Sequence, residues 1–321
     1  MTGTQYKQRL ASVFFICVFS ASPIHVHAQE SETGVVENVI QIIEQKEAST
    51  PETPSVLDER RNKDSVANKN PFSITQHRSN YLLPLTHVSN PNNITIDGLP
   101  EEAIDELEAK FQISIKTPIF LKDDGNTGLF FGFTTTSFWQ VYNSEASKPF
   151  RETNYEPEVF YQWQADWDIF GYRFNLAQIG FNHHSNGQDG LKSRSWNRVV
   201  ATALFSDKDT AYYLKTWWRL PEDDKTDPLD PTGDDNPDIN DFYGRAELGF
   251  VKQLGKVNLL ARWRNNLSFG DNRSGLELNF TYPLTKRYDL LLQYFNGYGD
   301  SLIDYNRHQQ RFGLGVQLRI L

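Results

Sequence analysis

Three polar residues lie close together in the chain and have the types that acyl transfer requires. His183 and Ser185 are two positions apart, and Asn197 follows in the next segment. Side chains two apart in a β-strand project from the same face, so an imidazole at 183 could take the hydroxyl proton at 185. A hairpin return would bring Asn197 to the other ring nitrogen. The trio predicts a serine nucleophile, a histidine base and an orienting amide, although a lone His-x-Ser is common by chance.

The N-terminus has the order of a secretory signal peptide. Two basic residues precede an apolar run over residues 10–21, and small residues stand before Gln29. The run is too short to cross a bilayer as a helix, which needs about 20 residues. We therefore expect residues 1–28 to be a cleaved signal. The single cysteine, Cys17, lies within it, which leaves no thiol for catalysis, metal binding or disulfides in the exported chain.

Composition favours a membrane β-barrel over other classes. Aromatic residues make up 13% of the chain but all hydrophobic residues only 38%, in short alternating runs. Strands of an outer-membrane barrel are apolar on one face only and therefore have modest average hydropathy. The net charge of -9 and the lack of a basic patch argue against a nucleic-acid partner.

Two regions follow the signal. Residues 29–76 are acidic and lack strand periodicity, so we expect a largely flexible N-terminal extension in the periplasm, with a short amphipathic helix over 35–43. Residues 77–321 carry the period of two that predicts an all-β, transmembrane antiparallel barrel of about 12 strands. The strand segments are 79–87, 110–121, 128–142, 157–167, 171–185, 196–206, 210–219, 239–252, 256–267, 273–282, 287–297 and 309–320.

Strand parity places the polar trio on the outer wall. Ile179 and Phe181 share the face of His183 and Ser185, so the nucleophile continues an apolar, lipid-facing row. Asn197 likewise shares its face with small and apolar residues of the next segment. Polar groups facing lipid are costly unless they bond one another. The substrate should then be a lipid.

The expected chemistry is ester hydrolysis. Ser185 would attack the carbonyl, His183 would pass the proton to the leaving alcohol, and Asn197 would fix the ring tautomer. Backbone N–H groups after Ser185 or a hard cation could hold the oxyanion. The Gln188 carbonyl and the Ser193 hydroxyl are oxygen donors of the kind that calcium accepts.

These residues also resemble a known family. His-His-Ser-Asn-Gly at 183–187 and Ser-Arg-Ser-Trp-Asn-Arg at 193–198 look like the active-site hairpin of bacterial outer-membrane phospholipase A. Four further stretches resemble the family in the same order, over about residues 70 to 321. They are 143–145, 149–157, 235–239 and 297–306.

The resemblance implies a calcium-dependent homodimer that hydrolyses sn-1 and sn-2 acyl esters of phospholipids and lysophospholipids in the outer membrane. It implies the same roles for the trio, with the oxyanion held by the Gly187 amide and by calcium-bound water. The implied calcium ligands are the Gln188 carbonyl and Ser193 hydroxyl of one subunit with the Ser147 carbonyl of the other. Asp235 matches a residue of a further calcium site in the monomer.

Three positions depart from the family pattern. Gln188 stands where the family often has Arg, which is harmless if only the carbonyl binds metal. Gly190 replaces an Asp, which removes a carboxylate from the monomer calcium site, although Asp189 could compensate. Thr135 replaces a Gln thought to bond across the dimer, so we expect a weaker or reshaped dimer contact.

Alternative readings remain open. A non-catalytic pore or structural barrel, with lumen charges that filter solutes, would share the fold, and so would a barrel enzyme acting on lipid A or on proteins. His184 should be a satisfied lumen side chain, and Asp304 a structural turn residue. We expect Trp196, Trp217 and Trp218 to be anchors at the membrane interface.

Overall fold

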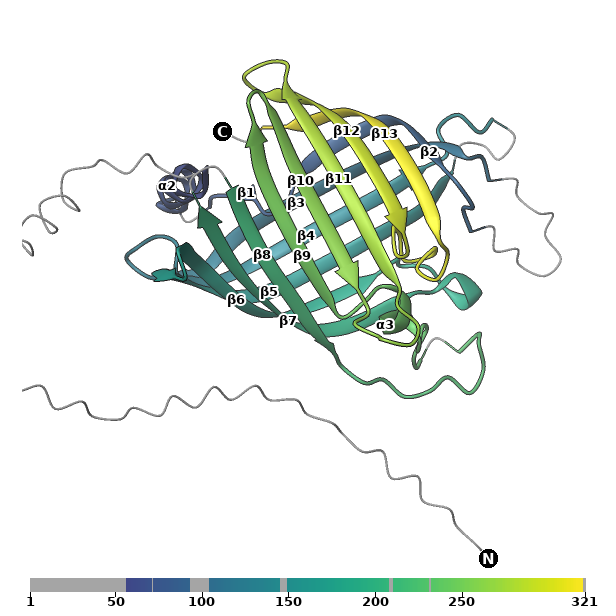
Figure 1. The fold of residues 1–321 in the computed structure, drawn as a ribbon. Coiled ribbons are helices and arrows are strands. Elements are labelled where there is room, and N and C mark those ends of the chain that lie inside the picture. Colours follow the sequence, from purple (N-terminus) through teal and green to yellow (C-terminus); the bar gives the residue numbers. More distant parts are fainter. Residues whose placement is uncertain are drawn as a thin grey trace, which may run out of the picture. The chain divides into compact units, whose positions relative to one another are not determined.

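A closed barrel forms most of the chain. The computed structural model describes residues 56–70, 72–92, 104–144, 149–207, 210–230 and 232–319. The expected signal peptide and the helix over 35–43 lie outside these residues. Twelve strands, β2 to β13, pair antiparallel with their neighbours, and the pairings of β13 with β2 and of β3 with β4 complete the ring (Figure 1). The predicted all-β barrel of about 12 strands is confirmed.

The strand bounds agree with most predicted segments. The strands are β1 (Thr75–Gln76), β2 (Asn80–Val88), β3 (Leu107–Leu121), β4 (Gly128–Trp139), β5 (Phe150–Ile169), β6 (Tyr172–Ser185), β7 (Ser195–Asp207), β8 (Thr210–Arg219), β9 (Ala246–Leu254), β10 (Val257–Asn265), β11 (Ser274–Pro283), β12 (Tyr288–Gly297) and β13 (Gln309–Leu318). The helices are α2 (Val56–Asn68), α3 (Ile239–Phe242) and the 3₁₀ turn η1 (Gly190–Lys192). None of the described helices is long and apolar enough to cross a membrane.

Two predicted strand starts are wrong. β5 begins seven residues earlier than the predicted position 157. Its start was missed because the polar run from Arg151 to Asn154 gives no apolar alternation. The segment predicted from 239 begins as α3, in which the Tyr243 N–H donates to the Ile239 carbonyl. β9 starts only at Ala246.

Within the expected extension, the described residues after 55 include the helix α2. Arg61 forms a bidentate ion pair with Asp166 (2.7 and 2.8 Å), and Asp64 pairs with Lys116 (2.8 Å). Residues 75–76 then pair with β3 as β1. The helix is held by charges rather than by an apolar stripe, so periodicity could not reveal it.

The two ends of the barrel differ in their connections. Short turns at one end join β3 to β4 over residues 122–127 and β5 to β6 over 170–171. Longer segments at the other end include 186–194, 220–245 and 298–308. Figure 1 shows α2 and α3 at opposite ends. Ser185 and Asn197 lie at the end with the long loops.

The two faces of the wall follow the predicted parity. In β13 Phe312 and Leu314 are exposed on the outside, while Arg311 is fully buried in the lumen. Many of the described lumen charges are paired, for example Arg262 with Glu277 and Lys110 with Asp300. Pairing offsets the cost of burying charge.

Two of the three tryptophans do not fit their predicted role. Trp196 is fully buried, and with Trp217 it belongs to an apolar cluster inside the barrel. The guanidinium of Arg198 lies 4.0 Å from the ring centroid of Trp196. The interface-anchor prediction is therefore wrong for Trp196 and Trp217, because strand parity turns both rings inward. Of these three tryptophans, Trp218 alone is exposed on the outer wall.

Candidate active site

The hairpin of β6 and β7 brings His183 and Asn197 together. The two residues are direct partners across the strands, and His183 Nδ1 lies 2.9 Å from Asn197 Oδ1. Both side chains are partly buried on the outer face, whereas His184 and Arg198 are buried in the lumen. This is the arrangement that strand parity requires.

Ser185 is the last residue of β6 and shares the face of His183. Two residues along a strand correspond to about 7 Å of backbone, within which an imidazole and a serine side chain can approach each other. Within the described chain, neither the Ser185 hydroxyl nor His183 Nε2 has a hydrogen-bond partner. The second ring nitrogen is therefore available to the serine.

Asn197 has a second partner that the sequence did not reveal. Its Nδ2 donates to Glu222 Oε1 at 3.1 Å. Glu222 stands just after β8, in the long acidic loop that leads to β9. The Leu220 N–H donates to the Asn197 carbonyl at 2.8 Å, which brings the start of this loop beside β7.

The loop after Ser185 is organised by Asn186, which is buried. Its Nδ2 donates to the Lys192 carbonyl (2.8 Å), and its Oδ1 accepts from the Arg194 N–H (2.9 Å). Gly187 follows with φ +63°, where a Cβ would also lie 3.3 Å from the Tyr155 ring. The proposed oxyanion donor thus lies in a left-handed turn that favours glycine.

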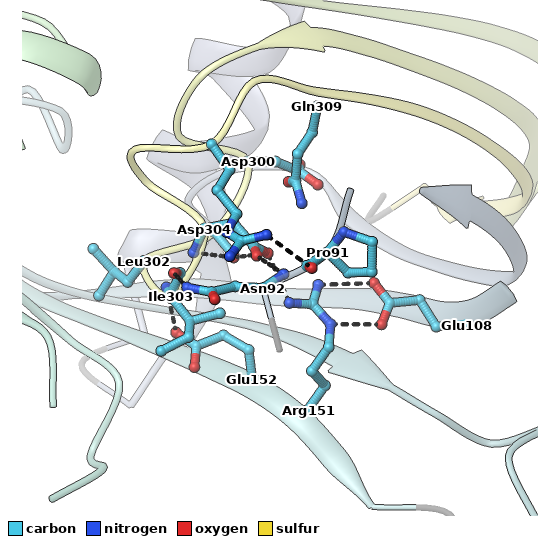
Figure 2. Close-up of polar contacts among 12 residues, drawn as sticks. Pro91, Asn92, Glu108, Arg151, Glu152, Asp300, Leu302, Ile303, Asp304 and Gln309 are labelled. Atoms are coloured by element: carbon cyan, nitrogen blue, oxygen red, sulfur yellow. Dashed lines mark hydrogen bonds and ion pairs between the residues drawn. The ribbon is translucent and has the colours of Figure 1, made fainter. Parts of the chain in front are cut away.

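Asn186 also links the site to a network of buried charges at the end of the barrel that carries the long loops. Its Nδ2 donates to Glu152 Oε2 at 3.2 Å, and the Ile303 N–H donates to Glu152 Oε1 at 3.2 Å. In Figure 2 the neighbouring Arg151 binds Glu108 with two hydrogen bonds (2.9 and 3.0 Å). Arg151 also donates to Asp304 at 2.7 Å.

The loop over 298–308 is held by its own buried acids. Asp304 is fully buried and accepts hydrogen bonds from the Ser301 hydroxyl and the Asn92 N–H, each at 2.7 Å. This supports the predicted structural role of Asp304. Burial and a hydrogen bond to Asp238 raise the pKa of Tyr305, so its hydroxyl stays protonated.

The predicted calcium ligands are only partly brought together. Ser147 lies outside the described residues. The Ser193 hydroxyl donates to Asp235 Oδ2 at 2.7 Å, and Lys225 Nζ lies 2.5 Å from Asp235 Oδ1. Gln188 is exposed in the same loop as Ser193. No cluster of three or more His, Cys, Asp or Glu residues that could hold a metal occurs in the described ranges.

This donor set suits a hard cation. The hydroxyl of Ser193, the carboxylate of Asp235 and a loop carbonyl are the oxygen ligands that calcium prefers. The positively charged Lys225 already forms an ion pair with this carboxylate. Gly190 has φ +54°, a left-handed conformation that glycine adopts without strain.

Comparison with known protein families points to a single family. The family model described as phospholipase A1 matches residues 57–318. Phospholipase A1 of Escherichia coli strain K12 is 37% identical over 254 residues, which cover 78% of this chain and 83% of the relative. Phospholipase A1 of Proteus vulgaris is 34% identical over 254 residues, with the same coverage.

Solved structures give the same result. The outer membrane phospholipase A of Escherichia coli is 35% identical, with a TM-score of 0.69, and the match covers 78% of this chain and all of that one. A Salmonella typhi outer membrane phospholipase, solved as a dimer with bound calcium, is 34% identical with a TM-score of 0.70. That match covers 80% of this chain and 98% of the other. With a family model spanning most of the chain and relatives above 30% identity, this protein belongs to the phospholipase A1 family.

Proposed function

We propose that this protein is an outer-membrane phospholipase that hydrolyses sn-1 and sn-2 acyl esters of phospholipids and lysophospholipids. The observation that carries the proposal is the 2.9 Å contact between His183 Nδ1 and Asn197 Oδ1, on the face that also bears Ser185. This polar group lies on the outer wall of a barrel whose outward side chains are otherwise largely apolar. A lipid ester reaches such a site without leaving the membrane.

The proposed reaction uses the side chains on this face. Ser185 Oγ attacks the ester carbonyl while His183 Nε2 takes its proton, and the protonated ring then returns that proton to the leaving alcohol. Asn197 holds Nδ1 and thereby keeps Nε2 directed to the serine. The Gly187 N–H, in the turn after Ser185, is suited to donate to the oxyanion. Water releases the fatty acid from Ser185 by the same steps.

Calcium fits the oxygen donors of the loop. The Gln188 carbonyl and the Ser193 hydroxyl would hold the ion at the active site with the partner subunit's Ser147, while Asp235 would contribute to a site in the monomer. Bound calcium would supply positive charge beside the developing oxyanion. The calcium-bound dimer of the Salmonella typhi relative supports the proposal that the active form here is a calcium-dependent homodimer.

The dimer would form through the outer wall. Thr135 projects outward in β4, between Ile113 of β3 and Tyr155 of β5, which are 50% and 40% exposed. A short hydroxyl at this position offers a weaker contact across an interface than a longer amide. We therefore propose a dimer that depends strongly on lipid and calcium.

The orientation of the barrel in the membrane follows from the different lengths of the loops at its two ends. Outer-membrane barrels have short periplasmic turns and longer external loops, which supports a periplasmic position for α2 and an active site near the outer surface. Export would use the signal of residues 1–28. A passive pore is less well supported, because buried ion pairs such as Lys110–Asp300 and Arg311–Glu108 occupy the lumen.

The test is fatty-acid release from mixed phospholipid micelles, with calcium or with a chelator. We expect calcium-dependent release by the refolded wild type and none by Ser185→Ala. Ser65→Ala, at the opposite end of the barrel, is the matched control and should retain activity. Lipids labelled at sn-1 or sn-2 identify the bond that is cleaved. A folded wild type that releases no fatty acid but conducts ions would favour the pore.

A further inference from the structure

We propose that Glu222 is a positioning residue that sets the orientation of the Asn197 amide and, through it, the tautomer of His183. The inference rests on the proposed hydrolytic function, because it concerns the base of that reaction. It extends the trio by a carboxylate from the loop between β8 and β9.

The hydrogen bonds determine which atoms donate and which accept from Glu222 through Asn197 to His183. A carboxylate can only accept, so Asn197 must turn its Nδ2 toward Glu222, at 3.1 Å from Oε1. Its Oδ1 then faces His183 Nδ1 at 2.9 Å. A carbonyl oxygen also only accepts, so the ring hydrogen must lie on Nδ1. This leaves the lone pair on Nε2, where the serine proton has to go.

An asparagine alone would not impose this order. Its amide can be turned over with almost no change in shape, and the turned form would present an N–H to Nδ1. The ring would then carry its hydrogen on Nε2 and could not accept a proton from Ser185. Glu222 selects against the turned form because it would place two acceptors against each other.

The charge of Glu222 has a second effect. An Asn in this position gives less electrostatic help to a protonated imidazole than an Asp would. A carboxylate one hydrogen bond behind the amide supplies part of the missing negative charge. The benefit appears only when His183 becomes positive, so it acts on the transition state and on kcat.

The structure holds Glu222 in place from both sides. Before it, the Leu220 N–H bonds the Asn197 carbonyl at 2.8 Å, and after it the Asp223 carbonyl accepts from the Asp234 N–H at 2.8 Å. Arg219 pairs with Asp234 and so ties the two ends of the loop together. Glu222 is partly buried, whereas Asp223 and Asp224 are exposed.

The first experiment compares kcat and KM for fatty-acid release by the wild type, Glu222→Gln and Glu222→Ala. We expect kcat to fall about tenfold or more in Glu222→Ala, since a hydrogen bond to a charged group is lost, with KM unchanged. Glu222→Gln keeps the shape of the side chain, so its kcat should fall less. Asp224→Asn removes the same charge from an exposed position of the loop and should retain wild-type kcat.

The second experiment separates positioning from a general structural role. In an Asn197→Ala background, Glu222→Ala should change kcat by less than about twofold, because its only route to the histidine is gone. Asn197→Asp should be poorly active, because it sets two carboxylates against each other. Adding Glu222→Gln should then restore activity severalfold. Additive losses in both backgrounds would overturn the proposal.

A spectroscopic readout does not depend on turnover. The ¹⁵N shifts of the His183 ring, assigned by their loss in His183→Ala, should report a hydrogen on Nδ1 in the wild type and a mixture of tautomers in Glu222→Ala. Unchanged shifts in an active enzyme would refute the role of Glu222. A wild type without lipase activity but with the expected shifts would instead refute the proposed function and leave the positioning intact.

Discussion

Replacing Asn186 by alanine should raise the calcium requirement of the enzyme without unfolding the barrel. Asn186 is the buried residue that closes the loop over 186–194 on itself. Its side chain makes hydrogen bonds to the Lys192 carbonyl, Glu152 and the N–H groups of Arg194 and Gln188, at 2.8, 3.2, 2.9 and 3.3 Å. The backbone bond from the Asn186 N–H to the Arg194 carbonyl, 3.0 Å, would remain.

The size of the effect follows from these contacts. A hydrogen bond contributes about 0.5–1.5 kcal/mol net, and the two longer bonds belong at the lower end of that range. The four together give about 3 kcal/mol of local stability. Glu152, 1% exposed, would also lose one of its donors. About 1.4 kcal/mol corresponds to a factor of ten in an equilibrium constant. The ratio of ordered to disordered loop should therefore fall roughly 100-fold.

The assay is a calcium titration of fatty-acid release. The loop carries the Gly187 amide, the Gln188 carbonyl and Ser193. In Asn186→Ala, calcium binding should therefore also have to supply the free energy that orders the loop. We expect the calcium concentration for half-maximal activity to rise by up to about 100-fold in Asn186→Ala. At saturating calcium, kcat should recover in part.

The control variant is Asn272→Ala. Asn272 bonds the Ser268 carbonyl at 3.0 Å within the loop between β10 and β11, so the change removes a similar amide from a loop outside the site. It should keep the wild-type calcium dependence. A folded Asn186→Ala enzyme with wild-type calcium response and kcat would refute the reasoning, because the loop would then not need its side-chain bonds.

Two further predictions concern charges beside the site. Lys225 neutralises Asp235 at 2.5 Å, so Lys225→Met should tighten calcium binding about tenfold in calorimetry on the inactive Ser185→Ala background; unchanged affinity would contradict this. Burial would raise the pKa of Asp300, but Arg311 and Lys110 outweigh it and lower the pKa below its ordinary value. The ion pairs therefore stabilise the fold above the unfolded pKa of about 4 and are lost as the pH falls further. Asp300→Asn should cost about 3–5 kcal/mol at pH 7, and its deficit against the wild type in thermal unfolding should shrink below pH 4; a constant deficit would contradict the assignment.

Strand parity is the part of the fold that the sequence could predict. It placed His183, Ser185 and Asn197 on one face and Arg198 in the lumen, because side chains in a strand alternate whatever the barrel around them does. It failed at the start of β5, where Glu152 and Glu156 occupy inward positions. The polar run from Arg151 to Asn154 gives no regular apolar row there, while the barrel interior accepts charges that are paired across it.

The loops were less predictable for a physical reason. Glu222 reaches Asn197 from 25 residues away, and Asn186 reaches Glu152 from 34. Such contacts depend on how an irregular backbone folds back, and no periodicity records that. The one available signal was composition: a loop rich in acids next to a site that lacks a carboxylate. It could suggest a charge near Asn197 but not which of the acids supplies it.

The thin wall of the barrel explains how the proposed catalytic groups on a lipid-facing surface can be held rigid. Lipid offers few polar partners, yet each outward residue of the trio has a neighbour in the chain that is anchored inside. His184 accepts from Trp196 Nε1 at 3.2 Å, and Arg198 pairs with Glu156 at 2.9 Å. Because the wall is a single strand layer, fixing the inward side chains fixes the backbone that aims the outward ones. The buried charges of the lumen therefore serve the outer face, and a barrel with an apolar interior would lack these directional bonds.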